Sequence, residues 1–202
     1  MAEQYTKVAI GDIGTQLFYF NDKSKVETVG EGGEVSTTEA PNFEYALPIT
    51  AGAEFGGDTE SFEAPETDLD YIPKVGGRKS FNDISYTVNF TADKYARAEA
   101  IINNTVAQTY MECLSDGSAM IFQGVSSMPT LTAGDVRQIT ITIIPSFVKF
   151  INNVFNLTQD EADVLNGLNL GVTFGQGEAV PINASSIPTV RAKYHTKKSD
   201  AE

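Results

Sequence analysis

Strict alternation of apolar and polar residues in two segments constrains this fold more than any other feature of the chain. Within residues 84–90, and again within 137–144, every second side chain is apolar. Successive side chains of a β-strand point to opposite faces of a sheet, so both segments predict strands with one buried and one polar face. The polar positions are Ser85, Thr87, Asn89, Gln138, Thr140 and Thr142. Such a sheet needs a second layer over its apolar face.

The rest of the chain supplies further strands. Thr109–Ser115 and Ser118–Val125 flank Asp116-Gly117, a dipeptide favoured in tight turns, and are therefore predicted to form a hairpin. Tyr5–Ile10 and Gln16–Phe20 are predicted as two strands near the amino terminus. Phe147–Ile151 is a candidate for one more.

The period then changes to that of a helix. Residues 93–107 carry an apolar stripe at spacings of three and four, with Thr91 as a candidate N-cap. The stripe predicts one amphipathic helix packed on the sheet through Tyr95, Ala98, Ile101 and Ile102. Further on, Thr158 and Glu161 form a capping-box pattern that predicts a short helix, Gln159–Asn166, ended by Gly167.

A third feature is the acidic segment from Glu39 to Asp70, which holds nine acidic residues and no Lys or Arg. It also contains three prolines and several aromatic residues, too many for a merely solvated loop. We interpret residues 36–76 as a long arm that becomes ordered by contact with another molecule. A mobile acidic loop is the alternative.

These patterns predict a mainly β (α+β) fold. It is an antiparallel β-sandwich or barrel with one packed amphipathic helix and a long acidic arm between strands. Residues 1–150 are predicted as the β core, including the arm, and 151–202 as a C-terminal extension to which the sequence assigns no role.

Composition argues against several functions. The net charge of −13 disfavours a protein that grips nucleic acid through a basic surface. The single histidine, His195, lies in a basic tail, and Cys113 sits in a predicted strand, so no nucleophilic triad or metal cluster is indicated. The glycine clusters lack the pattern of a nucleotide-binding loop. We therefore expect no cofactor, no metal, no membrane segment and no enzymatic activity.

Carboxylates are the one abundant chemical group. Glu66, Asp68 and Asp70 alternate as at the start of a calcium loop, but Tyr71 and Gly77 occupy the positions that need Gly and Glu. A carboxylate pair for glycoside hydrolysis stays open, because it requires a separation in space rather than in sequence. The pattern favours a protein that binds or assembles over one that catalyses.

The order of these elements over residues 35–150 resembles that of the major tail (tail tube) proteins of long-tailed bacteriophages. The segments that carry the resemblance are 66–70 (ETDLD), 75–79 (VGGRK), 84–90, 114–117 (LSDG), 122–125 (FQGV) and 130–144. It implies a virion protein, assembled in the host cytoplasm, whose hexameric rings stack into a tube. DNA would pass through without specific binding, and tape-measure and tail-terminator proteins would be its partners.

The resemblance also implies roles for residues. The arm would make assembly contacts through Phe43, Tyr45, Phe55, Phe62, Glu66, Asp68, Asp70 and Tyr71. Lumen or arm acids would be Glu54, Asp58, Glu60 and Glu63. Two alternatives remain: another ring protein of tail-like machines, and a β-sandwich that binds a ligand or carbohydrate.

Overall fold

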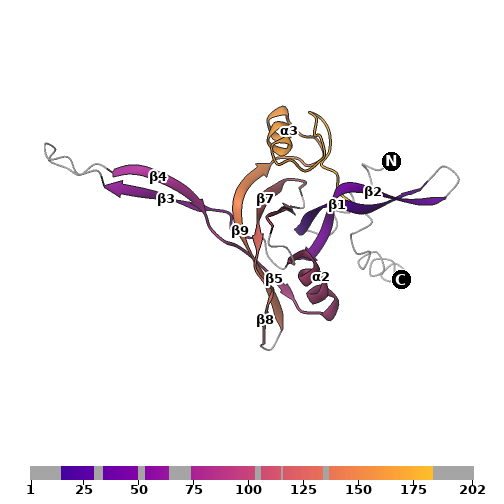
Figure 1. Cartoon of the computed structure of the whole chain (residues 1–202), viewed down its shortest axis with the longest axis horizontal. Helices are drawn as coiled ribbons and strands as arrows, with labels where there is room; N and C mark the ends of the chain where they lie inside the picture. The colour runs from indigo at the N-terminus through magenta and orange to yellow at the C-terminus, as the bar shows by residue number, and fades with distance from the viewer. Residues whose placement is uncertain are drawn as a thin grey trace, which may run out of the picture.

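The computed structural model describes residues 15–29, 34–49, 53–63, 74–102, 106–114, 116–133 and 137–183. At positions 28–29, 60–63, 74–79 and 102 it describes the backbone alone. Within these ranges the chain forms a seven-stranded sheet, a separate two-stranded hairpin and two helices (Figure 1). Neither helix of the described part has the length and apolar character needed to cross a bilayer.

Every strand pair is antiparallel. The sheet runs in the order β2-β1-β6-β7-β9-β5, with β8 added to the start of β9, while β3 pairs with β4 outside it. Its edges do not meet, so the fold is a sandwich-like open sheet rather than a closed barrel. The strands are β1 (Gln16–Val29), β2 (Val35–Pro48), β3 (Gly57–Glu63), β4 (Lys74–Phe81), β5 (Ile84–Asn89), β6 (Gln108–Cys113), β7 (Ala119–Ser126), β8 (Thr130–Thr132) and β9 (Gln138–Ile151). The predicted mainly antiparallel β fold is confirmed.

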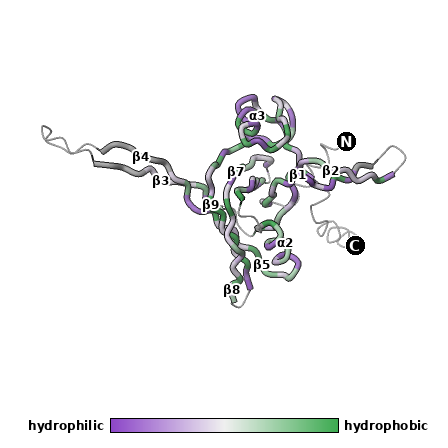
Figure 2. The backbone as a smooth tube through the Cα atoms, viewed as in Figure 1, coloured by the Kyte–Doolittle hydropathy of each residue, from purple (hydrophilic) through white to green (hydrophobic). Residues whose placement is uncertain are grey.

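Both faces of the central strands are buried. On one face, α2 (Ala92–Ile102) packs through Ala98 and Ile101 into a core that it shares with β1, β2, β5, β6, β7 and β9. On the other, residues 152–183, including α3 (Gln159–Asn166), cover the other ends of β1, β6 and β7. Consecutive residues such as Leu17 and Phe18 therefore point into different cores. Figure 2 shows hydrophilic residues along α3, at the outside of its layer.

Several local predictions are confirmed. In β5, Ile84, Tyr86 and Val88 are buried as the alternation requires. Thr91 caps α2, because its Oγ1 accepts from the Lys94 amide at 3.3 Å. The capping box of α3 is present, with the Thr158 hydroxyl and the Glu161 carboxylate each accepting from the other's backbone amide. Gly117 has a φ of 88°, which fits the turn between β6 and β7.

Other boundaries differ from expectation. α2 ends at Ile102, before the Asn103-Asn104 pair, and Val106 lies exposed beyond it. β9 continues through Pro145 to Ile151 as one strand rather than two. The predicted strand Tyr5–Ile10 lies outside the described residues.

The largest correction concerns the acidic arm. Residues 35–48 form β2, an edge strand of the main sheet. The β3–β4 hairpin projects away from the body, and the distal part of the β1–β2 hairpin projects on the opposite side (Figure 1). Pro41 and the acidic residues made this segment resemble a loop. An edge strand tolerates both, because half of its backbone groups have no ladder partner and its outer side faces water.

Candidate assembly surface

The β3–β4 hairpin is the part of the described chain that reaches farthest from the sheet (Figure 1). Its strands pair from Gly57↔Phe81 to Glu63↔Lys74, with one irregularity between Thr59 and Ser61. At the base, a Cβ on Gly57 would lie 2.1 Å from the Ser80 carbonyl oxygen. Only glycine permits this close approach of the two strands where the hairpin leaves the body.

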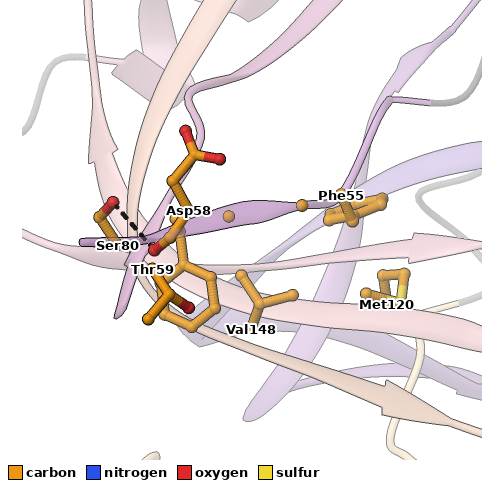
Figure 3. Close-up of a pocket in the computed structure, with 9 residues that line it drawn as sticks. Phe55, Asp58, Thr59, Ser80, Met120 and Val148 are labelled. Carbon is orange, nitrogen blue, oxygen red and sulfur yellow. Dashed lines mark hydrogen bonds between the residues drawn. The ribbon is translucent and has the colours of Figure 1, made fainter. Parts of the chain in front are cut away.

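A hollow of about 300 Å³ lies at the base of this hairpin (Figure 3). Its apolar wall is formed by Phe55, Met120 and Val148, together with Phe81. Phe55 packs against the core residue Phe122 with ring centroids 5.6 Å apart, whereas Phe81 is 45% exposed. The hairpin therefore emerges beside an apolar surface that the described residues leave partly open.

Acidic side chains lie next to this hollow. Glu54 and Asp58 are exposed, and in Figure 3 the Asp58 carboxylate points away from Val148 and Met120. Glu60 and Glu63 lie in β3, where the backbone alone is described. Of the four acids expected on a lumen or arm, Glu54 thus precedes the hairpin, and the other three lie on β3, with Asp58 at its base.

A buried carboxylate fixes the linker that precedes the hairpin. Glu112, on β6, is 2% exposed, and its Oε2 accepts from the Tyr86 hydroxyl at 2.7 Å and from the Ala53 amide at 3.4 Å. Burial raises the pKa of Glu112 above its ordinary value, although the two hydrogen bonds oppose that shift. The contact with Ala53 holds the linker against the sheet.

A second set of polar contacts lies where α2 meets β1 and β2, at the β2 edge of the sheet. The Tyr19 hydroxyl donates to Glu44 Oε2 at 2.6 Å, and the Arg97 guanidinium lies 5.6 Å from the centroid of the Tyr45 ring. Burial tends to raise the pKa of Glu44, but hydrogen bonds from Tyr19 and its neighbours and the charge of Arg97 outweigh it, so the pKa is lowered. Burial raises the pKa of Tyr45 to about 12, against a lowering effect of Arg97.

The sheet has two edges, β2 and β5, at opposite ends of its strand order. The β2 edge is covered at one point, since the Phe43 amide donates to Pro181 O at 2.9 Å and Phe43 O accepts from the Asn183 amide at 2.8 Å. Asn183 also donates through its side chain to Ser24 Oγ and Lys25 O, which ties residues 181–183 to β1. An edge strand with unpaired backbone groups is a site where another chain can add a strand.

The predicted assembly residues fall into three groups. Phe43 and Tyr45 are buried in the subunit's own core, so they are not arm residues that await a partner. Phe55 lines the hollow, and Phe62 lies in β3 with its side chain undescribed. Glu66, Asp68, Asp70 and Tyr71 lie outside the described residues.

The structure describes the side chains of three of the four expected helix-packing residues. Ala98 and Ile101 are buried, and Tyr95 packs against Phe90 with ring centroids 6.2 Å apart. Ile102 is the last residue of α2, and its side chain is not described.

Sequence reasoning missed the residues that complete the hollow. Met120 and Val148 come from β7 and β9, which pair beside each other, and Phe81 ends β4. A clue was present at Phe81, an aromatic residue next to the polar Asn82-Asp83 pair at the entrance to β5. Nothing in the sequence, however, places β4 next to β7 and β9.

No family model matches the chain, and no curated protein matches it. Among solved structures, it is similar to a chain of the tail of an empty gene transfer agent particle with C6 symmetry (TM-score 0.40, 15% identity, covering 67% of this chain and 93% of that one). It is also similar to a chain of the six-fold symmetrised baseplate of the anti-feeding prophage (TM-score 0.40, 6% identity, covering 68% of this chain and 92% of that one). A chain of the native gene transfer agent virion gives a TM-score of 0.39 at 15% identity, covering 64% and 97%.

Proposed function

We propose that this chain is the structural subunit of a bacteriophage tail tube. Copies of it assemble into hexameric rings, and the rings stack into a conduit for DNA ejection. The proposal rests first on the order of the sequence elements over residues 35–150. Its role is structural rather than enzymatic, and it uses no cofactor.

The observation that carries the proposal is the pair of separated sheet edges. β2 and β5 each have a neighbouring strand on one side only within the sheet. When the β5 edge of one copy joins the β2 side of the next, the contact is head-to-tail and can be repeated. A head-to-tail contact that closes by rotation produces a ring and removes the unpaired edges.

The β3–β4 hairpin supports the stacking of such rings. β3 alone has seven residues, which extend roughly 23 Å at about 3.3 Å per residue. A projection of this length, beginning beside an apolar hollow, is suited to contact a copy in the adjacent ring. Tape-measure and tail-terminator proteins are then the expected partners, and the virion tail is the expected location.

The charge of the chain fits passage of DNA. Each subunit has a net charge of −13. A basic channel would bind phosphates through release of counterions, whereas a tube without a basic wall does not hold the duplex. The conduit therefore has no specific DNA site.

Shortening the hairpin tests this proposal. Asp58 and Ser80 lie directly opposite each other, so residues 59–79 can be replaced by a two-residue Asn-Gly turn. We expect a folded subunit with an unchanged circular dichroism spectrum that forms no tubes by negative-stain microscopy, while the wild type forms hollow tubes.

The wild-type protein is the decisive control. If it stays a monomer at every concentration and forms neither rings nor tubes, the proposal is wrong, and a ligand-binding module becomes the better interpretation. If it forms single rings that never stack, it is a different ring protein of a tail-like machine. Tubes formed by the shortened variant would remove the hairpin from the stacking contact.

A further inference from the structure

One part of the sheet presents an ordered array of uncharged polar side chains. The alternation that buries Ile84 to Val88 and Ile139 to Ile143 places the intervening residues on the other face, and β8 adds two threonines to it. We call this array the hydroxyl face. Its members are Ser85, Thr87, Asn89, Thr130, Thr132, Gln138, Thr140 and Thr142.

The register arranges these residues in rows across the strands. Thr87, Thr140 and Thr130 form one row, because Thr87 pairs with Thr140 and Thr140 with Thr130. Asn89, Gln138 and Thr132 form the next row in the same way. In the third row, the Ser85 and Thr142 hydroxyls are hydrogen-bonded at 3.1 Å. The rows are about 6.7 Å apart, and the strands about 4.8 Å apart.

The hydroxyl face is not covered by either helical layer of the described structure. α2 packs on the opposite side of β5 and β9, and the α3 layer covers the farther ends of β1, β6 and β7. All eight side chains are exposed or half-buried. In Figure 1, β5 and β8 lie at the end of the molecule opposite α3. An accessible face of this extent is available to a partner.

The chemistry of the face is unusual for a chain in which 20% of the residues are charged. None of its eight side chains carries a charge. Charged groups flank both ends: at one end Arg137 precedes Gln138 and Lys94 Nζ donates to the Asn89 carbonyl at 3.2 Å, and at the other the exposed Asp83 precedes β5. Between them, hydroxyls and amides can bind water, but they neither attract phosphates as lysine does nor repel them as aspartate does.

We propose that the hydroxyl face is the part of the channel wall over which duplex DNA passes. This inference rests on the proposed function and refines it, because it assigns an uncharged, hydrated surface to the wall in place of the acids at the hairpin base. β5 contributes one column of the array and is also an open edge, so a neighbouring copy that extends the sheet there would continue the wall. β-branched threonines, which dominate the array, are stiff at χ1 and keep this surface regular.

Cysteine labelling of assembled tubes tests the assignment. Thr140→Cys places a thiol within the hydroxyl face, Thr87→Cys provides a second position, and the native Cys113 is fully buried. The matched control is Glu99→Cys on the exposed side of α2, on the opposite side of the sheet. Each variant is treated with a small maleimide and with a maleimide attached to a globular protein, both as free subunits and as tubes.

We expect both reagents to label all variants as free subunits. In tubes, the small reagent should still label Cys at 140 and 87, while labelling by the bulky reagent is lost at these positions and kept at 99. Labelling of position 140 by the bulky reagent in tubes would place the face outside and overturn the inference. Loss of labelling by both reagents would make the hydroxyl face a contact between copies, which would also overturn the inference. Absence of tubes in the wild type would instead refute the proposed function itself.

A charge-insertion variant gives an independent readout. Thr140→Lys tubes assembled with a short DNA duplex should retain it, protect it from nuclease and release it as salt is raised. Glu99→Lys tubes should leave any bound duplex open to nuclease. Equal protection by both variants, or by neither, would contradict the channel assignment.

Discussion

Replacing Phe43 with alanine separates a core role from an assembly role. Phe43 has no exposed surface, and its ring packs edge-on against Phe20 with centroids 5.2 Å apart. Removing a fully buried phenylalanine costs about 3–5 kcal/mol, from the lost burial and the cavity left behind. For a protein of this size, 1 kcal/mol lowers Tm by about 2–4 °C, so Phe43→Ala should lower Tm by roughly 6–20 °C.

Urea unfolding followed by circular dichroism measures this loss at low protein concentration, where assembly does not contribute. Phe81→Ala is the matched control, because the same truncation at a 45% exposed residue should cost about 1 kcal/mol or less. We expect Phe81→Ala to keep its stability and to weaken tube formation. If instead the free energy of unfolding of Phe43→Ala stays within about 1 kcal/mol of the wild-type value and the variant fails to assemble, our assignment of Phe43 to the core is wrong.

Two further predictions concern charge. Glu112→Gln should raise the free energy of unfolding more at pH 7 than at pH 4: burial raises the folded pKa above the ordinary 4.5, so the wild type loses stability as pH rises through that pKa. Urea unfolding at pH 7 and pH 4 measures this change in the free energy of unfolding, with Glu99→Gln at an exposed position as the control. An equal change at the two pH values would contradict the prediction. Tube formation, followed by light scattering, should slow below about 0.01 M salt because acidic subunits repel; faster assembly there would count against this repulsion.

The sequence allowed the single-sided strands and the starts of both helices to be predicted, since those signals are local, whereas the end of α2 was placed too late. Alternation identified β5 and the first half of β9, and the Thr158–Glu161 pair identified α3. β6 was found through its turn rather than through alternation, because the sheet is covered on both sides there and its residues are buried throughout. β2 was missed because an edge strand with Pro41 has the composition of a loop.

The candidate site was harder to predict than the fold. Alternation placed Thr87 and Thr140 on polar faces, but only the long-range register makes them neighbours, with Thr130 beside them. A single sequence does not contain that register. The hollow likewise combines Phe55, Met120 and Val148 from three distant segments.

The two backbone hydrogen bonds between Phe43 and residues 181–183 make the two edges of the sheet, β2 and β5, unequal. If two copies paired β2 to β2 about a two-fold axis, residues 181–183 of both copies would lie at the contact. In a β5-to-β2 contact, residues 181–183 of only one copy lie there. In the proposed ring, residues 181–183 would therefore disfavour a symmetric β2-to-β2 pair, which is incompatible with a repeated β5-to-β2 contact.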